Sequence, residues 1–218
     1  MLNIFGFSEG TFPVTYLGIP LIQGRVTSNT IRPLVEKIRK RVNSWIGKLL
    51  SFQGRVVLAR AILNSIHIYN MAIYKWPRLL IKEEDSIIRN FIWTGDPSKR
   101  KGITVKWEKV CKPLKEWGLG VRSLKEVNDA MLCKLYWAFC DRQDGWSKFM
   151  QAKFTNKVDD FIQYHKKSTI WLGIKLAARI SRPYMGWLVG NGEVINFWRD
   201  TWATEIPLRE YIKMPQSM

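Results

Sequence analysis

The sequence predicts a mainly α-helical protein: a helical bundle, then further helices and a small β-hairpin near the C-terminus. Apolar residues recur at three- and four-residue spacing over long stretches, which is typical of amphipathic helices. Hydrophobic residues make up 46% of the 218 residues and aromatic residues 13%, enough to build a core. A Gly-Asn-Gly sequence at 190–192 separates two apolar segments, as in a β-hairpin.

The N-terminal third is predicted to contain loops and then two helices. Glycine and proline interrupt residues 1–27 too often for a helix, so we expect loop there, with a short strand at 14–17. Apolar spacing predicts a first helix from Asn29 to Trp45. A second helix is predicted from Phe52 to Ile68, with Ser51 as its cap.

Helices continue through the middle of the chain. A third helix is predicted from Ile81 to Trp93, followed by an exposed basic loop at 98–102. Residues 103–107 alternate apolar and polar side chains, which favours a short strand. The S-x-x-E sequence at 123–126 is a capping box that opens the clearest helix of the second half. Residues 28–140 are therefore assigned to one helical region.

The C-terminal part is predicted to be looser. Polar residues thicken between 141 and 167, which makes this segment a candidate linker, although a short helix at 146–154 also fits its apolar spacing. Residues 168–218 are predicted to hold a helix over 168–179 and the β-hairpin formed by 187–189 and 194–198.

Charge is the strongest functional signal. The chain carries 35 Lys and Arg against 18 Asp and Glu, a net charge of +17. This favours a polyanion as partner, either nucleic acid or an anionic membrane surface, whereas a role in solubility alone is the third interpretation. Residues 32–60 hold eight basic side chains against one acid, on two successive helices, and such faces bind phosphates without reading sequence. The candidate nucleic-acid-binding residues are Arg39, Lys40, Arg41, Lys48, Ser51, Gly54, Arg55 and Arg60.

Two further signals near these residues have alternative interpretations. A helix capped by Ser51 would offer free amides to an anion, with Gly54 allowing close approach and Arg55 closing on a phosphate. Alternatively, Gly54 only admits a neighbouring helix. Several tryptophans lie at helix ends and are predicted to pack in the core, with base stacking as the alternative for one or two: Trp45, Trp76, Trp93 and Trp107.

No catalytic or metal site is predicted. Three cysteines without a CxxC pair, helped only by His67 and His165, do not supply ordinary zinc ligands, and no cofactor is expected. The Asp159–Asp160 pair lacks an identifiable third carboxylate and is predicted to be a solvated turn. The longest charge-free apolar stretch, 61–74, is too short and polar to span a bilayer, so no membrane partner and an intracellular location are expected.

A series of short motifs runs in order along the chain. The most distinctive are Tyr16–Leu21 (YLGIPL), Leu50–Arg55 (LSFQGR), Phe91–Gly95 (FIWTG), Val110–Pro113 (VCKP) and Ile195–Trp198 (INFW). Together they resemble the reverse transcriptases of plant non-LTR (LINE-type) retrotransposons, over essentially the whole chain.

In that family these motifs follow the catalytic palm. The resemblance implies that residues 14–70 correspond to the thumb, which clamps primer and template, and the rest to a connection that leads to a Cys/His-rich segment and often a ribonuclease H domain. It places the catalytic Asp-Asp hairpin upstream of Tyr16 and the Cys/His-rich segment after Trp202. We therefore expect a fragment of an RNA-directed DNA polymerase that lacks the catalytic palm and is inactive alone.

The resulting hypothesis is a polymerase fragment that binds RNA or DNA duplex non-specifically. The resemblance further implies Mg²⁺ as the cofactor of the parent polymerase, a palm domain in another polypeptide as partner, and a nuclear location. The alternative is a transposon-derived interaction module or a non-functional relic.

Overall fold

The computed structural model describes residues 11–46, 49–102, 104–157, 160–162, 164, 166–193 and 195–212. The described chain is mainly helical, as predicted. Two short antiparallel strands come first, β1 (Val14–Tyr16) and β2 (Ile19–Leu21). The bundle that follows contains α1 (Ser28–Asn43), α2 (Phe52–Ala61), η2 (Leu63–Ser65), α3 (Ile68–Met71) and α4 (Arg78–Thr94). Then come α5 (Trp107–Val110), η3 (Leu114–Glu116), α6 (Leu124–Asp141), α7 (Gly145–Phe154), α8 (Trp171–Ser181), η4 (Arg182–Tyr184) and α9 (Leu208–Ile212).

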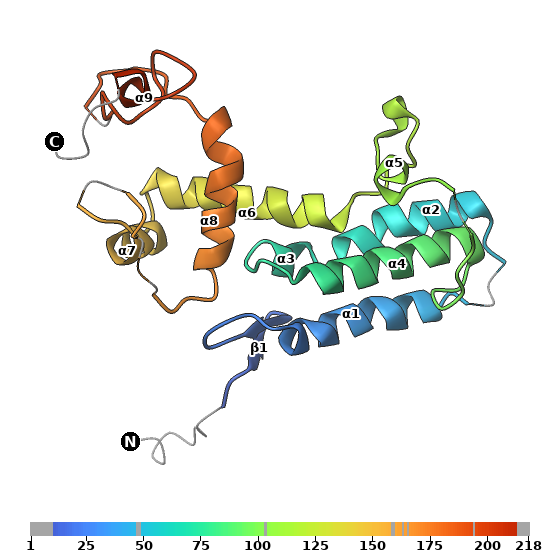
Figure 1. Cartoon of the computed structure of the whole chain (residues 1–218). Coiled ribbons are helices and arrows are strands. Elements are labelled where there is room, and N and C mark those ends of the chain that lie inside the picture. The colour runs from blue at the N-terminus through green and yellow to red at the C-terminus, as the bar shows by residue number, and fades with distance from the viewer. Residues whose placement is uncertain are drawn as a thin grey trace.

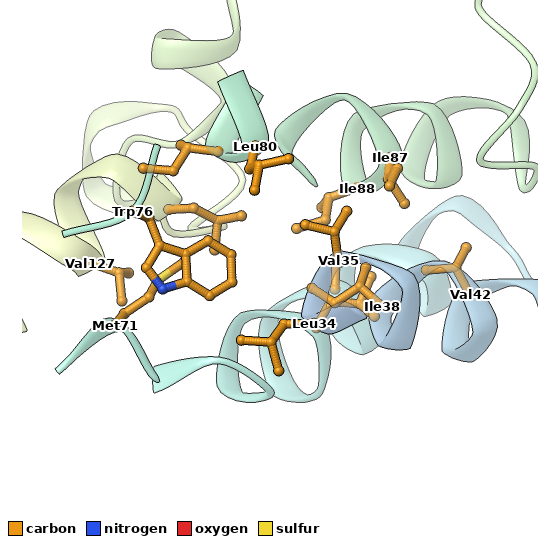
Figure 2. Close-up of a cluster of buried hydrophobic side chains, with 14 of the residues drawn as sticks. Leu34, Val35, Ile38, Val42, Met71, Trp76, Leu80, Ile87, Ile88 and Val127 are labelled. Atoms are coloured by element: carbon orange, nitrogen blue, oxygen red, sulfur yellow. The ribbon is translucent and has the colours of Figure 1, made fainter. Parts of the chain in front are cut away.

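Helix α4 is the centre of the bundle. It packs against both α1 and α2, which lie on opposite sides of it in Figure 1. The apolar side chains of α1 meet those of α4, with Val35 near Ile88 (Figure 2). Burying these aliphatic side chains is the main source of stability, about 1.5–3 kcal/mol for each large one. The bundle therefore has a well-packed hydrophobic core, which fixes the positions of the basic residues on its surface.

Asn128 of α6 fastens this helix to the bundle. Its side-chain oxygen accepts a hydrogen bond from the Trp76 amide at 3.0 Å. Its amide nitrogen donates to the carbonyls of Met71 at 2.8 Å and Tyr74 at 2.9 Å. These backbone groups are buried between α3 and α4, where an unpaired group costs about 1–3 kcal/mol. A polar residue on an apolar helix face is thus explained by three bonds.

The second predicted helix is shorter than expected. It ends at Ala61, and the 3₁₀ turn η2 and the short α3 replace its last two turns. Asn64 donates to the Arg122 carbonyl at 3.1 Å, and the Ser65 hydroxyl donates to the Ile62 carbonyl at 2.8 Å. Polar side chains that bond to backbone in this way compete with the helical hydrogen bonds. The single helix predicted over 52–68 was therefore wrong beyond Ala61.

Both other β predictions were wrong. Thr104 to Lys106 form no strand and lead into α5, and Ile103 lies outside the described residues. The C-terminal hairpin is absent as well: neither 187–189 nor 195–198 is a strand, and Val194 is not described. Trp187 instead donates its amide to the Thr201 carbonyl at 2.7 Å, so this segment folds against a later loop. The strand predicted at 14–17 was confirmed, with β2 as its partner.

A second core follows the bundle along α6. The last turns of α6 pack with α7 and α8 around aromatic rings, and we call this part, residues 132–185, the aromatic body. The candidate linker at 141–167 contains α7, whose Met150 and Phe154 are buried in this core. Helix α6 extends through both cores, and Ser123 is its N-cap as predicted, although its side chain makes no capping hydrogen bond.

Candidate nucleic-acid interface

One end of the bundle gathers the ends of three helices. The ring of Trp45, just after α1, lies 5.5 Å from that of Phe91 on α4. Phe52, the first residue of α2, lies 5.0 Å from Trp93. Figure 1 shows the same meeting of the C-terminal ends of α1 and α4 with the N-terminal end of α2. Segments far apart in the sequence thus form one surface.

This surface is basic. Its cations come from the last turn of α1, from the first turn of α2 and from the loop after α4, which we together call the basic end: Lys40, Arg41, Arg55, Lys99, Arg100 and Lys101. All but Arg55 are exposed. Asp96 lies 3.7 Å from the exposed Lys99, a surface ion pair that contributes little to stability. The predicted basic loop at 98–102 is confirmed as exposed and belongs to this surface.

The acids of the bundle are turned inward or paired. Glu84 is fully buried, 3.2 Å from the His67 imidazole, and burial raises the pKa of its carboxyl. Burial also raises the pKa of Asp85 to about 6, so its negative charge is held weakly. Glu83 lies 3.0 Å from Arg39 and 3.7 Å from Arg32. The positive charge therefore dominates the outer surface of the bundle.

Arg39 is only partly exposed, because its charge is paired with two carboxylates. Its guanidinium donates to Glu83 of α4 at 3.0 Å and lies 3.4 Å from Glu36 of its own helix. These contacts tie α1 to α4. Arg39 therefore contributes to packing between the helices. Its role in binding phosphate stays a prediction, and the ion pairs with Glu83 and Glu36 compete with that role.

Lys40 and Arg41 lie in the last turn of α1, where cations interact favourably with the helix dipole. Both are exposed, and the Arg41 guanidinium lies 5.7 Å from the centre of the Trp45 ring. The ring, which is itself buried, therefore packs against this exposed side chain. Lys48 lies outside the described residues.

Ser51 caps α2 as predicted. Its hydroxyl accepts a hydrogen bond from the Gly54 amide at 3.1 Å. A Cβ at Gly54 would meet, among the described residues, only the Ser51 hydroxyl at 3.4 Å and Leu50 at 3.9 Å. No described helix approaches this glycine, so the neighbouring-helix interpretation was wrong. The anion-binding interpretation stays a prediction, with the Gly54 amide already occupied by Ser51.

Arg55 and Arg60 each lie over a glycine. A Cβ at Gly95, which ends α4 with a φ of +77°, would come within 2.8 Å of the Arg55 guanidinium. At Gly120 a Cβ would be 3.4 Å from the Arg60 guanidinium carbon. Both arginines thus cover backbone that has no side chain of its own. Arg55 is half-buried by this contact, whereas Arg60 is exposed.

The predicted residues do not form one stripe. Because α1 and α2 pack on α4 from opposite sides, the predicted residues of the two helices do not share one continuous helix face (Figure 1). Arg60, at the far end of α2, instead lines a hollow of about 430 Å³ with Arg122. Sequence reasoning did not include Arg122, Arg100 or Lys101 among the candidates. In the sequence, the only sign that these three cations are exposed is that they lie in polar loops that contain glycine.

For metal ligands and membrane-spanning helices, the structure bears only on the residues that it describes. Among these residues, no three His, Cys, Asp or Glu side chains are grouped as metal ligands would be. Asp160 lies 2.7 Å from the Arg199 guanidinium, and Asp159 and His165 are not described. The tryptophans predicted to pack do so, with Trp45 and Trp76 buried in the bundle core. No described helix combines the length and apolarity needed to cross a bilayer.

The chain is similar to two proteins of Arabidopsis thaliana. One, named "Putative ribonuclease H protein", is 33% identical over 198 residues, which are 88% of this chain and 32% of that protein. The other, an uncharacterized mitochondrial protein, is 35% identical over 71 residues, 32% of this chain and 46% of that protein. The chain thus spans less than half the length of either relative, and no protein-family model matches it. These similarities support a relation to retrotransposon-derived plant proteins, and neither name specifies a reverse transcriptase thumb.

Proposed function

We propose that the chain is the thumb and connection part of a plant LINE-type reverse transcriptase and that it binds RNA or DNA duplex without reading sequence. The ordered motifs support the assignment. The ribonuclease H in the name of the larger Arabidopsis relative fits a family whose connection often leads to such a domain. Polymerisation would require a palm and its Mg²⁺, and the nucleus is the location that this family implies.

The observation that carries the binding proposal is the distribution of charge in the bundle. Five exposed cations and the half-buried Arg55 meet at the basic end, while Glu84 is buried and Glu83 is paired. Phosphates replace counterions on such a surface and release them to solution. The contacts need no particular base, so the affinity is independent of sequence.

A salt titration tests this proposal. The affinity of the purified chain for an RNA–DNA duplex is measured by fluorescence anisotropy over a range of salt concentrations. The logarithm of the association constant should fall linearly with the logarithm of the salt concentration, with a slope of about −3 to −5 for four or five phosphate contacts. Duplexes of unrelated sequence should give the same line. A slope near zero, or one strongly preferred sequence, would contradict the proposal.

A second function, a protein-interaction module, has one observation in its favour. The β1–β2 hairpin exposes apolar side chains, with Tyr16 62% and Leu17 81% exposed. Exposed apolar patches of this kind often mark protein contacts. If the chain bound no duplex at any salt concentration yet self-associated in sedimentation experiments, this function would be preferred.

A further inference from the structure

A short segment projects from the bundle beyond α2. Figure 1 shows it as the loop that contains α5 and η3 and returns to the start of α6. Four exposed lysines recur along it at three-residue spacing: Lys106, Lys109, Lys112 and Lys115. Two acids, Glu108 and Glu116, accompany them, and the Lys112 ammonium lies 3.0 Å from Glu116. The projection therefore has a positive charge of its own.

Trp117 lies on this projection, directly after η3. Its side chain is 98% exposed, although a ring of this size normally packs in a core. Its backbone is also unusual, with φ at +62°, a conformation that bulky residues rarely adopt. The indole is thus exposed to solvent, and its residue has a backbone conformation that is unfavourable for a bulky side chain. Neither feature contributes to the stability of the fold.

The backbone around Trp117 is tightly fixed. Its amide donates to the Leu114 carbonyl at 3.2 Å, and the Gly118 amide donates to the Pro113 carbonyl at 3.1 Å. A Cβ at Gly118 would lie 1.9 Å from the Lys112 carbonyl oxygen, so only glycine allows this close approach. These contacts define one conformation of the loop. The ring is presented from a fixed backbone.

The base of the projection rests on the bundle. Gly120, which ends the loop, lies under the Arg60 guanidinium of α2. Arg60 and Arg122 both line the hollow beside this contact. Two cations therefore lie where the projection returns to the bundle, in addition to the lysines along it. A nucleic-acid strand bound along this surface would meet cations both on the projection and at its base.

We propose that Trp117 stacks on an unpaired base where a duplex ends in a single strand, with Lys109, Lys115 and Arg122 holding the flanking phosphates. This proposal rests on the nucleic-acid binding proposed above and assigns it a second contact. One flat ring among spaced cations matches a base between phosphates, since every base offers a π-face. A membrane contact would use a wider apolar face than one ring and Leu114 provide.

The test compares two RNA–DNA duplexes, one blunt and one with a single-stranded extension. Trp117→Gly removes the ring and suits the positive φ, so this variant should fold at least as well as the wild-type chain. Trp117→Phe retains a stacking ring. Trp137→Ala is the matched control, because it removes another exposed tryptophan, on α6. Affinities are measured by fluorescence anisotropy, and the fold of each variant is checked by circular dichroism.

Trp117→Gly should bind the extended duplex about tenfold more weakly, the loss of roughly one stacked base, and the blunt duplex with about the same affinity as before. Trp117→Phe should recover most of this loss, and Trp137→Ala should bind both like wild type. If the wild-type chain binds and Trp117→Gly binds the extended duplex equally well, the stacking proposal fails alone. If the wild-type chain binds neither duplex, both proposals fail. Trp117-dependent binding to phosphatidylserine vesicles, without any effect on the extended duplex, would also overturn the stacking proposal.

Discussion

The bundle and the aromatic body are held together in different ways. Most of the bundle core is aliphatic, and polar groups such as His67, Glu84 and Asn128 are buried within it. In the aromatic body, rings pack on rings: Phe154 stacks on Trp171 at 4.4 Å, and Phe161 meets the same tryptophan edge-on at 4.8 Å. Buried carboxyl groups are therefore a feature of the bundle, whereas the aromatic body depends mainly on packing between rings.

Their cations differ as well. In the aromatic body, Lys153, Lys175 and Arg182 lie 5.4, 5.9 and 4.5 Å from the centres of aromatic rings. Such cation–π contacts contribute about 0.5–1 kcal/mol each at exposed sites, and they hold the cationic group against a ring. At the basic end of the bundle, Arg100 and Lys101 project from a loop into solvent. The basic end has one such contact too, between Arg41 and Trp45, but it adds the exposed cations of the loop after α4. We therefore expect its cations to be better placed for a phosphate backbone.

The largest effect is expected from Phe154→Ala. This ring is fully buried and stacked, so its removal leaves a cavity and should lower the free energy of unfolding by about 4 kcal/mol, measured in urea. Hydrogen exchange should accelerate in α7 and α8 far more than in α1 and α4. Leu172→Ala, at an exposed position of α8, is the control and should change stability little. Equal loss of protection in both parts would show that the two cores unfold as one unit.

A smaller effect is expected from Asp85→Asn in the bundle. Burial raises the pKa of Asp85 from 3.8 to about 6, so the folded state holds a proton that the unfolded state releases. The free energy of unfolding should therefore fall as pH rises from 4 to 7, by about 2 kcal/mol from this group. Asp85→Asn should remove this part of the pH dependence and stabilise the chain at neutral pH. Urea unfolding at several pH values measures it.

Asp141→Asn, at an exposed carboxyl at the end of α6, serves as the control for that experiment. Because this carboxyl is exposed, its replacement should change the free energy of unfolding at neutral pH little. A wild-type profile that rises with pH over the same range would contradict the assignment of Asp85 as a buried, weakly held charge.

Sequence periodicity predicted most of the helices because each amphipathic face is a local property. The break after Ala61 could not be predicted, since it depends on Asn64 reaching a carbonyl 58 residues away. The same limit applies to the site. The exposure of Arg41 follows from its helix face, but the pairing of Arg39 with Glu83 joins residues 44 apart. Trp117 gave no signal, because nothing in its local sequence shows that the ring is left in solvent.

The most direct test of nucleic-acid binding by the basic end is a pair of double charge reversals. Arg41→Glu with Arg100→Glu alters the basic end, and Lys134→Glu with Arg179→Glu alters exposed positions of the aromatic body by the same net charge. Affinity for a blunt RNA–DNA duplex is measured at one fixed salt concentration. The first pair should weaken binding about tenfold more than the second, because two phosphate contacts are lost as well as overall attraction. Equal weakening by both pairs would mean that net charge alone attracts the duplex and that the basic end is not its binding site.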